Sequence, residues 1–145
     1  MTRDRLTGTS AAAGEPASSV VAGLTNNGAL LEIARAAVVE AERRGARVRF
    51  VQVLPPGASP DERADADLLT FRAALQALHG RSRVAFTFET VDGDPAEVLV
   101  GRSSDAVSLV IGEDAPDDGH AVARYCREHA ACEVITVPGS VGAPA

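Results

Sequence analysis

The most constraining feature of this sequence is a regular exchange between short apolar runs and longer segments with helical periodicity. Apolar runs at 20–24, 48–54, 84–91, 107–111 and 132–137 predict five strands. The segments between them carry helix start and stop signals and predict four helices. This alternation predicts a parallel sheet that is covered by helices on both faces.

The expected fold is a single doubly wound α/β sandwich of the Rossmann-like or flavodoxin-like kind. Right-handed crossovers between five parallel strands commonly give the strand order 3-2-1-4-5. In such a sheet the ligand crevice lies beyond the carboxyl ends of the strands, where the strand order reverses. That point falls between the first and fourth strands, so we expect the loops 25–28 and 112–119 to form any site.

The length of 145 residues is enough for one domain with a substantial core. Segment 19–138 carries the whole alternating pattern and is expected to fold as that domain. Segments 1–18 and 139–145 show no periodicity and are expected to be disordered tails.

Capping residues mark the expected helix boundaries. Asn26 and Asn27 precede the first helix and can cap it, and Gly45 follows that helix where a left-handed C-terminal cap belongs. The segment 59–62 reads Ser-Pro-Asp-Glu, a capping box with Pro at the first helical position. Asp94, followed by Pro-Ala-Glu, repeats this start signal for a short third helix.

Apolar residues predict how the second helix and the third strand are buried. Leu68, Phe71, Leu75 and Leu78 repeat at helical spacing and are expected to form the buried face of the second helix. The third strand alternates apolar residues with Thr and Glu, which is typical of a strand at the edge of a sheet.

Charge and composition exclude several classes of function. The net charge is −6 without a basic patch, which argues against nucleic-acid binding. The chain contains no Lys, so a Walker A phosphate loop and Schiff-base catalysis are excluded. No apolar run approaches the ~20 residues that cross a bilayer, and the N-terminus has no apolar leader, so no membrane association is expected. Two cysteines without an export signal fit a reducing compartment, and we expect a cytoplasmic protein.

Four segments of the sequence resemble the universal stress protein family. They read VVAGLTNNGALLEIARAAVVEAERRGARVRFVQVL, GDPAEVLV, SLVIG and ACEVITVP, and in their order and spacing they span about 19–138. The resemblance implies the doubly wound fold and, in many members, a dimer formed by the last strands. It also implies ATP binding in those members that have a G-x2-G-x9-G-[ST] loop after the fourth strand. Few members have an established enzymatic activity.

The ATP-binding pattern of that family is largely missing from this chain. ATP-binding members have an Asp at the end of the first strand, where Thr25 stands here. The loop that begins at Gly112 is several residues too short, and only Gly119-His120 resembles its final Gly-Ser or Gly-Thr pair. Acids in this loop suit the positive end of the next helix but repel a triphosphate, so we expect no tight ATP binding in the usual pose. These acids are Glu113, Asp114, Asp117 and Asp118.

Adenine-nucleotide binding with a rewritten phosphate loop is the alternative. Mg²⁺ can bridge carboxylates to the phosphate oxygens of ATP or AMP. Backbone groups of Val53 can contact the base, and His120 can supply a donor at the helix start. The candidate crevice residues are Gly23, Thr25, Asn26, Val53, Gly112, Gly119 and His120.

A flavin- or metal-linked enzyme on the same fold is the third interpretation. Cys126, His129 and Cys132 have zinc-ligand side chains at close spacing, but their positions on a helix and a strand favour core packing of the cysteines. The segment 25–28 could hold a flavin phosphate, yet the chain has no Trp and no aromatic residue where a flavin ring would stack. A phosphoacceptor receiver domain is excluded, because it needs a Lys and acids after the first strand.

The expected function is a non-enzymatic role in stress response or regulation, with weak nucleotide hydrolysis left open. No cofactor is expected, with ATP or AMP plus Mg²⁺ as the alternative. The expected partners are a second copy of the chain, which would pair with the apolar edge of the last strand, and an unidentified regulatory protein. The residues of that edge are Val134, Ile135, Thr136 and Val137.

Overall fold

Five parallel strands form one sheet in the order β3-β2-β1-β4-β5, which confirms the predicted topology. The computed structural model describes residues 18–25, 29–81, 83–114 and 121–138. The strands are β1 (Ser19–Leu24), β2 (Arg47–Leu54), β3 (Phe86–Asp92), β4 (Ser108–Gly112) and β5 (Glu133–Val137). The helices are α1 (Leu30–Arg44), α2 (Pro60–Leu78), α3 (Pro95–Arg102) and α4 (Val122–His129). The expected tails fall outside the described residues, except for Ser18.

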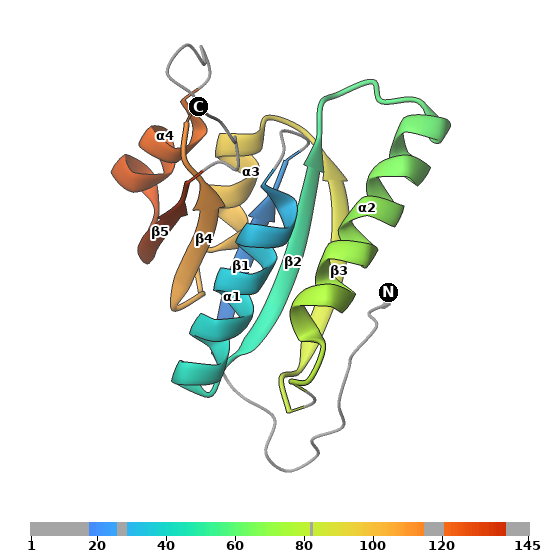
Figure 1. Ribbon diagram of the computed structural model, residues 1–145. Coiled ribbons are helices and arrows are strands. Elements are labelled where there is room, and N and C mark those ends of the chain that lie inside the picture. The colour runs from blue at the N-terminus through green and yellow to red at the C-terminus, as the bar shows by residue number, and fades with distance from the viewer. Residues whose placement is uncertain (1–17, 26–28, 82, 115–120, 139–145) are drawn as a thin grey trace, which may run out of the picture.

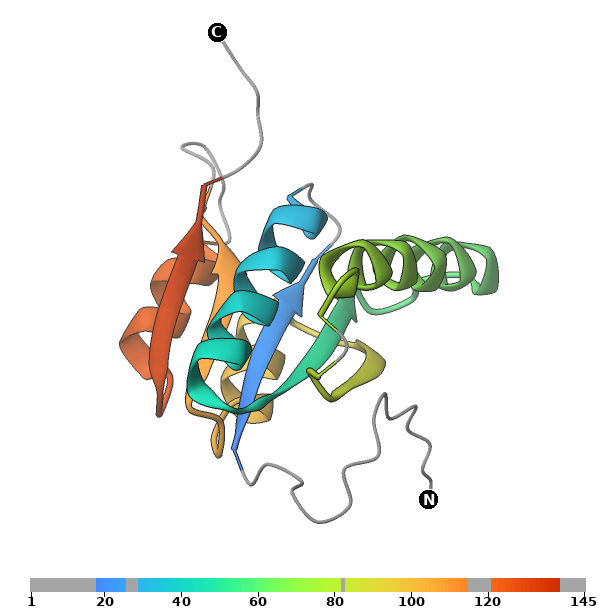
Figure 2. The ribbon, with the colours of Figure 1, turned by 60° about the horizontal axis from the view of Figure 1, so that its bottom comes forward.

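The helices cover the two faces of the sheet in pairs. The helices α1 and α2 lie over one face, and α3 and α4 lie over the other (Figure 1; Figure 2). Alternate residues of β1 point to opposite faces, so Ala22 packs under α1 while Val21 packs in the cluster with α3 and α4. Every residue of β1 is buried, which makes this strand the centre of both halves of the core.

The two edge strands differ from the centre in burial. The residues of β3 are half-buried, apart from the exposed Asp92, and those of β5 are half-buried after the exposed Glu133. The prediction that the third strand lies at an edge is therefore confirmed. On that edge Phe88 stacks on Phe50 of β2, with ring centroids 5.5 Å apart, and so closes the core beneath α2.

Most of the predicted caps are present. Gly45 has a φ of 64°, a left-handed conformation that favours glycine, and its N–H bonds back to α1. Ser59 and Glu62 form the reciprocal capping box, and the Asp94 side chain accepts a bond from the Glu97 N–H at 3.0 Å. The predicted caps Asn26 and Asn27 lie outside the described residues. The residue at the N-cap of α1 is Ala29, which provides no side-chain acceptor.

The predicted buried face of α2 is wrong. Leu68, Phe71 and Leu75 are 44–48% exposed, and Leu78 is half-buried. The buried face consists of small residues that lie on the other side of the helix. They are Ala66, Thr70, Ala73, Ala74 and Ala77. Small side chains let the helix axis approach α1 and the sheet closely, and this leaves the large apolar side chains facing outward.

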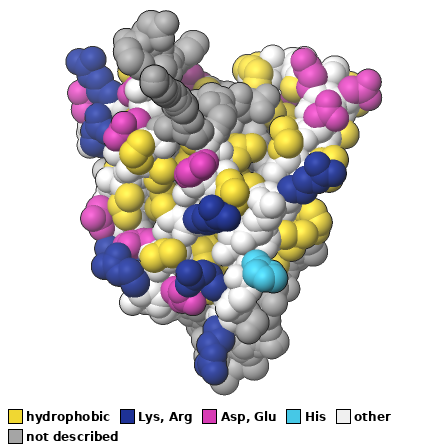
Figure 3. Space-filling view, in the orientation of Figure 1, with side chains coloured by type: hydrophobic (Ala, Val, Ile, Leu, Met, Phe, Trp, Pro, Cys, Tyr) yellow, Lys and Arg dark blue, Asp and Glu magenta, His cyan; other side chains and the backbone are white. Residues whose placement is uncertain are grey.

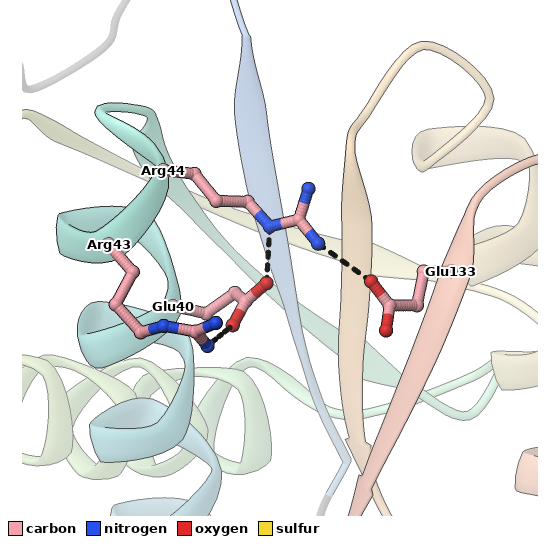
Figure 4. Close-up of polar contacts among 4 residues, drawn as sticks. All are labelled: Glu40, Arg43, Arg44 and Glu133. Carbon is pink, nitrogen blue, oxygen red and sulfur yellow. Dashed lines mark hydrogen bonds and ion pairs between the residues drawn. The ribbon is translucent and has the colours of Figure 1, made fainter.

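A charged network ties α1 to the last strand. Glu40 is 6% exposed, and its carboxylate accepts from Arg43 Nη1 at 2.7 Å and from Arg44 Nε (Figure 4). The guanidinium of Arg44 also donates through Nη2 to Glu133 Oε1 at 2.7 Å. Arg43 and Arg44 thus lie in the last turn of α1, as expected for the helix dipole, and they also neutralise the buried Glu40.

Replacing Glu40 by Gln tests this network. The change keeps the shape of the side chain but removes the charge that both arginines share. Because the arginines are partly exposed, we expect a loss of about 1 kcal/mol in the free energy of unfolding. Urea denaturation measures this loss, with Glu32→Gln on the exposed first turn of α1 as the control. Equal stability of the two variants would show that the network contributes nothing.

Cys126 is a core residue, as predicted. It has no exposed surface and packs in the cluster with Leu109 and Ala123. Burial raises the pKa of its thiol from 9.0 to about 11, and the negative charge of Asp114 adds to this shift. The buried thiol therefore stabilises the fold below pH 9, because ionisation is easier in the unfolded chain.

That stabilisation should disappear as the pH rises from 9 toward 11, where the unfolded state loses its proton first. We expect the free energy of unfolding of the wild type to fall more steeply over this range than that of Cys126→Ala. Denaturant titrations at a series of pH values measure the two slopes. Cys132→Ala is the control and should keep most of the wild-type slope, since that thiol is only half-buried. Parallel curves for wild type and Cys126→Ala would contradict the assignment.

Candidate functional site

The candidate site lies at the carboxyl ends of β1 and β4, where the strand order reverses. These strands pair from Val20 opposite Ser108 to Ala22 opposite Val110, so their last residues meet at one edge of the sheet. A small cavity opens there, and three of the predicted crevice residues line it, namely Gly23, Thr25 and Gly112. The other lining residues are Leu99, Ile111, Glu113, Asp114 and Val122.

The cavity is far smaller than a nucleotide. Its volume is about 20 Å³, which is room for roughly one water molecule. Pockets that bind small organic ligands usually measure ~300–1,000 Å³. Leu99 and Ile111 fill the floor: a Cβ added to Gly23 would lie 2.7 Å from Leu99 Cδ1 and 2.8 Å from Ile111 Cγ2. The glycine is therefore required by the packing of β1 against these two side chains.

An acid of the protein itself occupies the N-terminus of α4. Asp114 Oδ1 accepts from the Ala123 N–H at 2.8 Å, and Oδ2 accepts from the Arg124 N–H at 3.1 Å. The N-cap residue Ala121 provides no side-chain acceptor, and its φ of 45° is left-handed. Asp114, seven residues earlier in the chain, thus takes the role of the missing cap. The expectation that acids of this loop interact with the positive end of the helix is confirmed for Asp114.

Of the other predicted crevice residues, Val53 is the one that the structure describes. Val53 is 1% exposed and packs beside Leu99 in the core, so it does not line the opening. Asn26, Gly119 and His120 lie outside the described residues, as do Asp117 and Asp118. Sequence reasoning missed the apolar floor and the specific partner of Asp114. The acid-rich composition of the loop was the one signal that pointed toward this contact.

The side chains considered as zinc ligands against core packing, Cys126, His129 and Cys132, do not form a cluster. Among the described residues no group of three or more His, Cys, Asp or Glu side chains could hold a metal ion. Cys126 is buried in the core, and Cys132 precedes β5, which begins at Glu133. None of the helices in the described part of the chain is long and apolar enough to cross a membrane.

The predicted dimer strand has one open side. Within the described residues β5 pairs only with β4, and it forms one end of the sheet. Val134, Ile135, Thr136 and Val137 are all half-buried. Val134 packs against the cluster with α3 and α4, while Ile135 and Val137 pack against the cluster with α1 and α2. Thr136 belongs to neither cluster.

The fold is similar to several solved universal stress proteins. The chain matches one from Burkholderia pseudomallei at 26% identity and a TM-score of 0.61, over 84% of this chain and 96% of that one. It matches one from Archaeoglobus fulgidus in complex with dAMP at 26% identity and a TM-score of 0.63, over 82% and 95%. A universal stress protein in complex with cAMP matches at 17% identity and a TM-score of 0.66, over 85% and 98%.

No family model matches the sequence, and no curated protein sequence does. The similarity is carried by the strand order, the coverage of nearly the whole of each matched chain, and the agreement of independent structures from different organisms. The strand order and these matches together show that the chain has the fold of the universal stress proteins.

Proposed function

We propose that this chain is a non-enzymatic regulatory protein that acts as a homodimer and does not bind ATP in the usual pose of its family. The observation that carries this proposal is the pair of hydrogen bonds from the N-terminus of α4 to the Asp114 carboxylate. Backbone N–H groups at a helix start are the usual donors for a phosphate. Here two of these donors are already used by an anion that belongs to the protein.

A phosphate that entered this position would meet two costs. It would have to displace Asp114, which leaves the donors of Ala123 and Arg124 without their acceptor. It would also lie beside the displaced carboxylate and Glu113. Two unit charges ~4 Å apart repel by about 4 kcal/mol at an effective dielectric constant of 20. The repulsion exceeds the ~0.3–1 kcal/mol that a helix dipole usually offers an anion.

The chemistry of the cavity favours regulation over catalysis. Its described lining contains two carboxylates, one hydroxyl and otherwise backbone and apolar groups. Nucleophilic catalysis commonly needs a free base beside a Ser, Cys or Thr, and of the two carboxylates in the described lining Asp114 already accepts from two backbone N–H groups.

Adenine-nucleotide binding is the second candidate function. It is favoured by the two similar structures whose ligands are dAMP and cAMP. In this chain a nucleotide would require Asp114 to leave the helix start or to share a Mg²⁺ ion with the phosphate. Carboxylate and phosphate oxygens are both good ligands for that ion.

Titration with Mg²⁺-ATP and AMP separates the two candidates. We expect no measurable heat of binding for the wild type and no nucleotide released on denaturation. Asp114→Ala frees both backbone donors and removes the repulsion from this carboxylate, so its binding of AMP should become measurable. Asp105→Ala, an exposed acid away from the cavity, is the control. Micromolar affinity of the wild type would refute the first candidate and support the second.

The proposed dimer is supported by the open, half-apolar edge of β5, since such an edge favours pairing with another strand. Thr136→Lys places a charge at this edge without altering either core cluster. We expect it to halve the mass of the assembly in multi-angle light scattering. Thr87→Lys on the opposite edge strand β3 is the matched control and should keep the wild-type mass. An unchanged mass in both variants would rule out the β5 interface.

A further inference from the structure

The outer face of α2 is an exposed apolar surface. Among the described residues five large apolar side chains are exposed, between 41% and 48%, and four of them belong to this one helix. They are Val39 of α1 and Leu68, Leu69, Phe71 and Leu75 of α2. Figure 3 shows hydrophobic side chains over the arm formed by α2 and in the hollow between α1 and α2. We call this surface the α2 face.

Helical geometry makes the α2 face continuous. Leu68, Phe71 and Leu75 are separated by three and four residues, so they lie along one side of the helix, away from the alanines. Toward β3 this side continues into Phe88, whose ring centroid is 5.7 Å from that of Phe71. Toward α1 it borders an open hollow lined by Arg35, Leu75, Gln76 and His79. Contiguous exposed apolar surface of this kind marks an interaction site.

Charge is divided along the α2 face. Asp61 and Asp65 lie on its N-terminal half, and Arg72 lies on its C-terminal half, where Arg35 of α1 lines the adjoining hollow. None of these four residues takes part in an ion pair with another described residue. The face therefore has an acidic end and a basic end that do not neutralise each other within the molecule.

We propose that the α2 face binds the α2 face of a second copy of this chain, with the two helices antiparallel. A two-fold axis near the segment 68–72 would place Leu68 of one copy against Phe71 of the other and Ala64 against Leu75. The same axis brings the acidic end of each helix over the basic end of its partner. Such an interface is isologous, and antiparallel helix pairs favour this interlocking of large and small side chains.

The charges favour a second copy over other occupants. A parallel pair of helices would place acid against acid, and an unrelated partner would need a matching apolar stripe with the inverse charge order. A groove on the other side of the α2 face is lined by Asp67, Phe71, Phe88, Glu89 and Thr90. Its polar groups have partners within the molecule, since Thr90 donates to Asp67 at 2.6 Å and Arg102 pairs with Glu89 at 2.7 Å. The groove therefore does not need a charged ligand. The charges that decide which partner fits are those of Asp61, Asp65 and Arg72 on the α2 face itself.

The α2 face is independent of the nucleotide crevice and of β5. The helix α2 and the strand β5 lie at opposite ends of the sheet (Figure 1; Figure 2). With both surfaces in use, the dimers proposed to form through β5 join through the α2 face into a larger assembly, and loss of either interface leaves a dimer.

Charge reversal tests the proposal on the full chain. Asp65→Arg and Arg72→Asp each place like charges across the antiparallel pair, while the double variant Asp65→Arg/Arg72→Asp restores opposite charges with reversed sign. The measurement is sedimentation velocity over a range of protein concentrations, in the Thr136→Lys background, which blocks the β5 edge. We expect each single change to weaken self-association about tenfold and the double variant to recover most of it.

Two further results bear on the outcome. Leu75→Glu, on an exposed position that cannot disturb the core, should also abolish self-association in this background, and circular dichroism checks the fold of every variant. A Thr136→Lys protein that is monomeric at all concentrations would overturn the proposal and assign the face to a different protein. Equal behaviour of the single and double variants would also overturn it, because an interface without this charge pairing gives no recovery. Neither result alters the conclusion for the nucleotide crevice, which calorimetry tests separately.

Discussion

The burial of β1 on both faces is the constraint on which the rest of the structure depends. A strand in this position must carry apolar side chains in both directions, and its neighbours must bring helices to both faces. Val21 and Ala22, adjacent in sequence, enter opposite halves of the core for this reason. Gly23 then allows Leu99 and Ile111 to close over the end of the strand. The same packing that completes the core leaves a cavity of about 20 Å³ where related folds place a ligand.

Two features of the described crevice oppose phosphate binding, namely its small volume and the Asp114 carboxylate at the start of α4. Asp114 supplies the acceptor that Ala121 cannot, so α4 is capped from a neighbouring segment. A cap of this kind usually contributes ~0.5–2 kcal/mol to stability. A phosphate at this position would therefore compete with the capping of α4 for the same backbone donors. A regulatory role fits this arrangement, because the groups that would bind phosphate already stabilise the fold.

Sequence reasoning predicted the strand order, because each strand is either a compact apolar run or alternates clearly and because handedness limits the topology. It also predicted Gly45, Ser59 and Asp94 as caps, since capping is local chemistry. It failed for α2, where large apolar residues at helical spacing predict the buried face but the structure buries the small residues on the other side. Periodicity in the sequence identifies an apolar stripe on a helix, but it does not give the distance between that helix and its neighbours. Here α2 lies so close to α1 and the sheet that only small side chains fit between them. The sequence also could not predict the hydrogen bonds between Asp114 and α4, because the distance between these two segments depends on the path of the loop that joins them.

The error at α2 has a physical consequence. A helix that buries alanines contributes less apolar burial than one that buries leucines, since the free energy gained is proportional to the area removed from water. In the single chain the large side chains of α2 remain exposed to water, where they lower the solubility and add nothing to the core. Their helical spacing, with acids at one end and Arg72 toward the other, fits the proposed burial of these side chains between molecules. The stability of the assembled protein would then depend on its concentration, because part of its apolar burial is intermolecular.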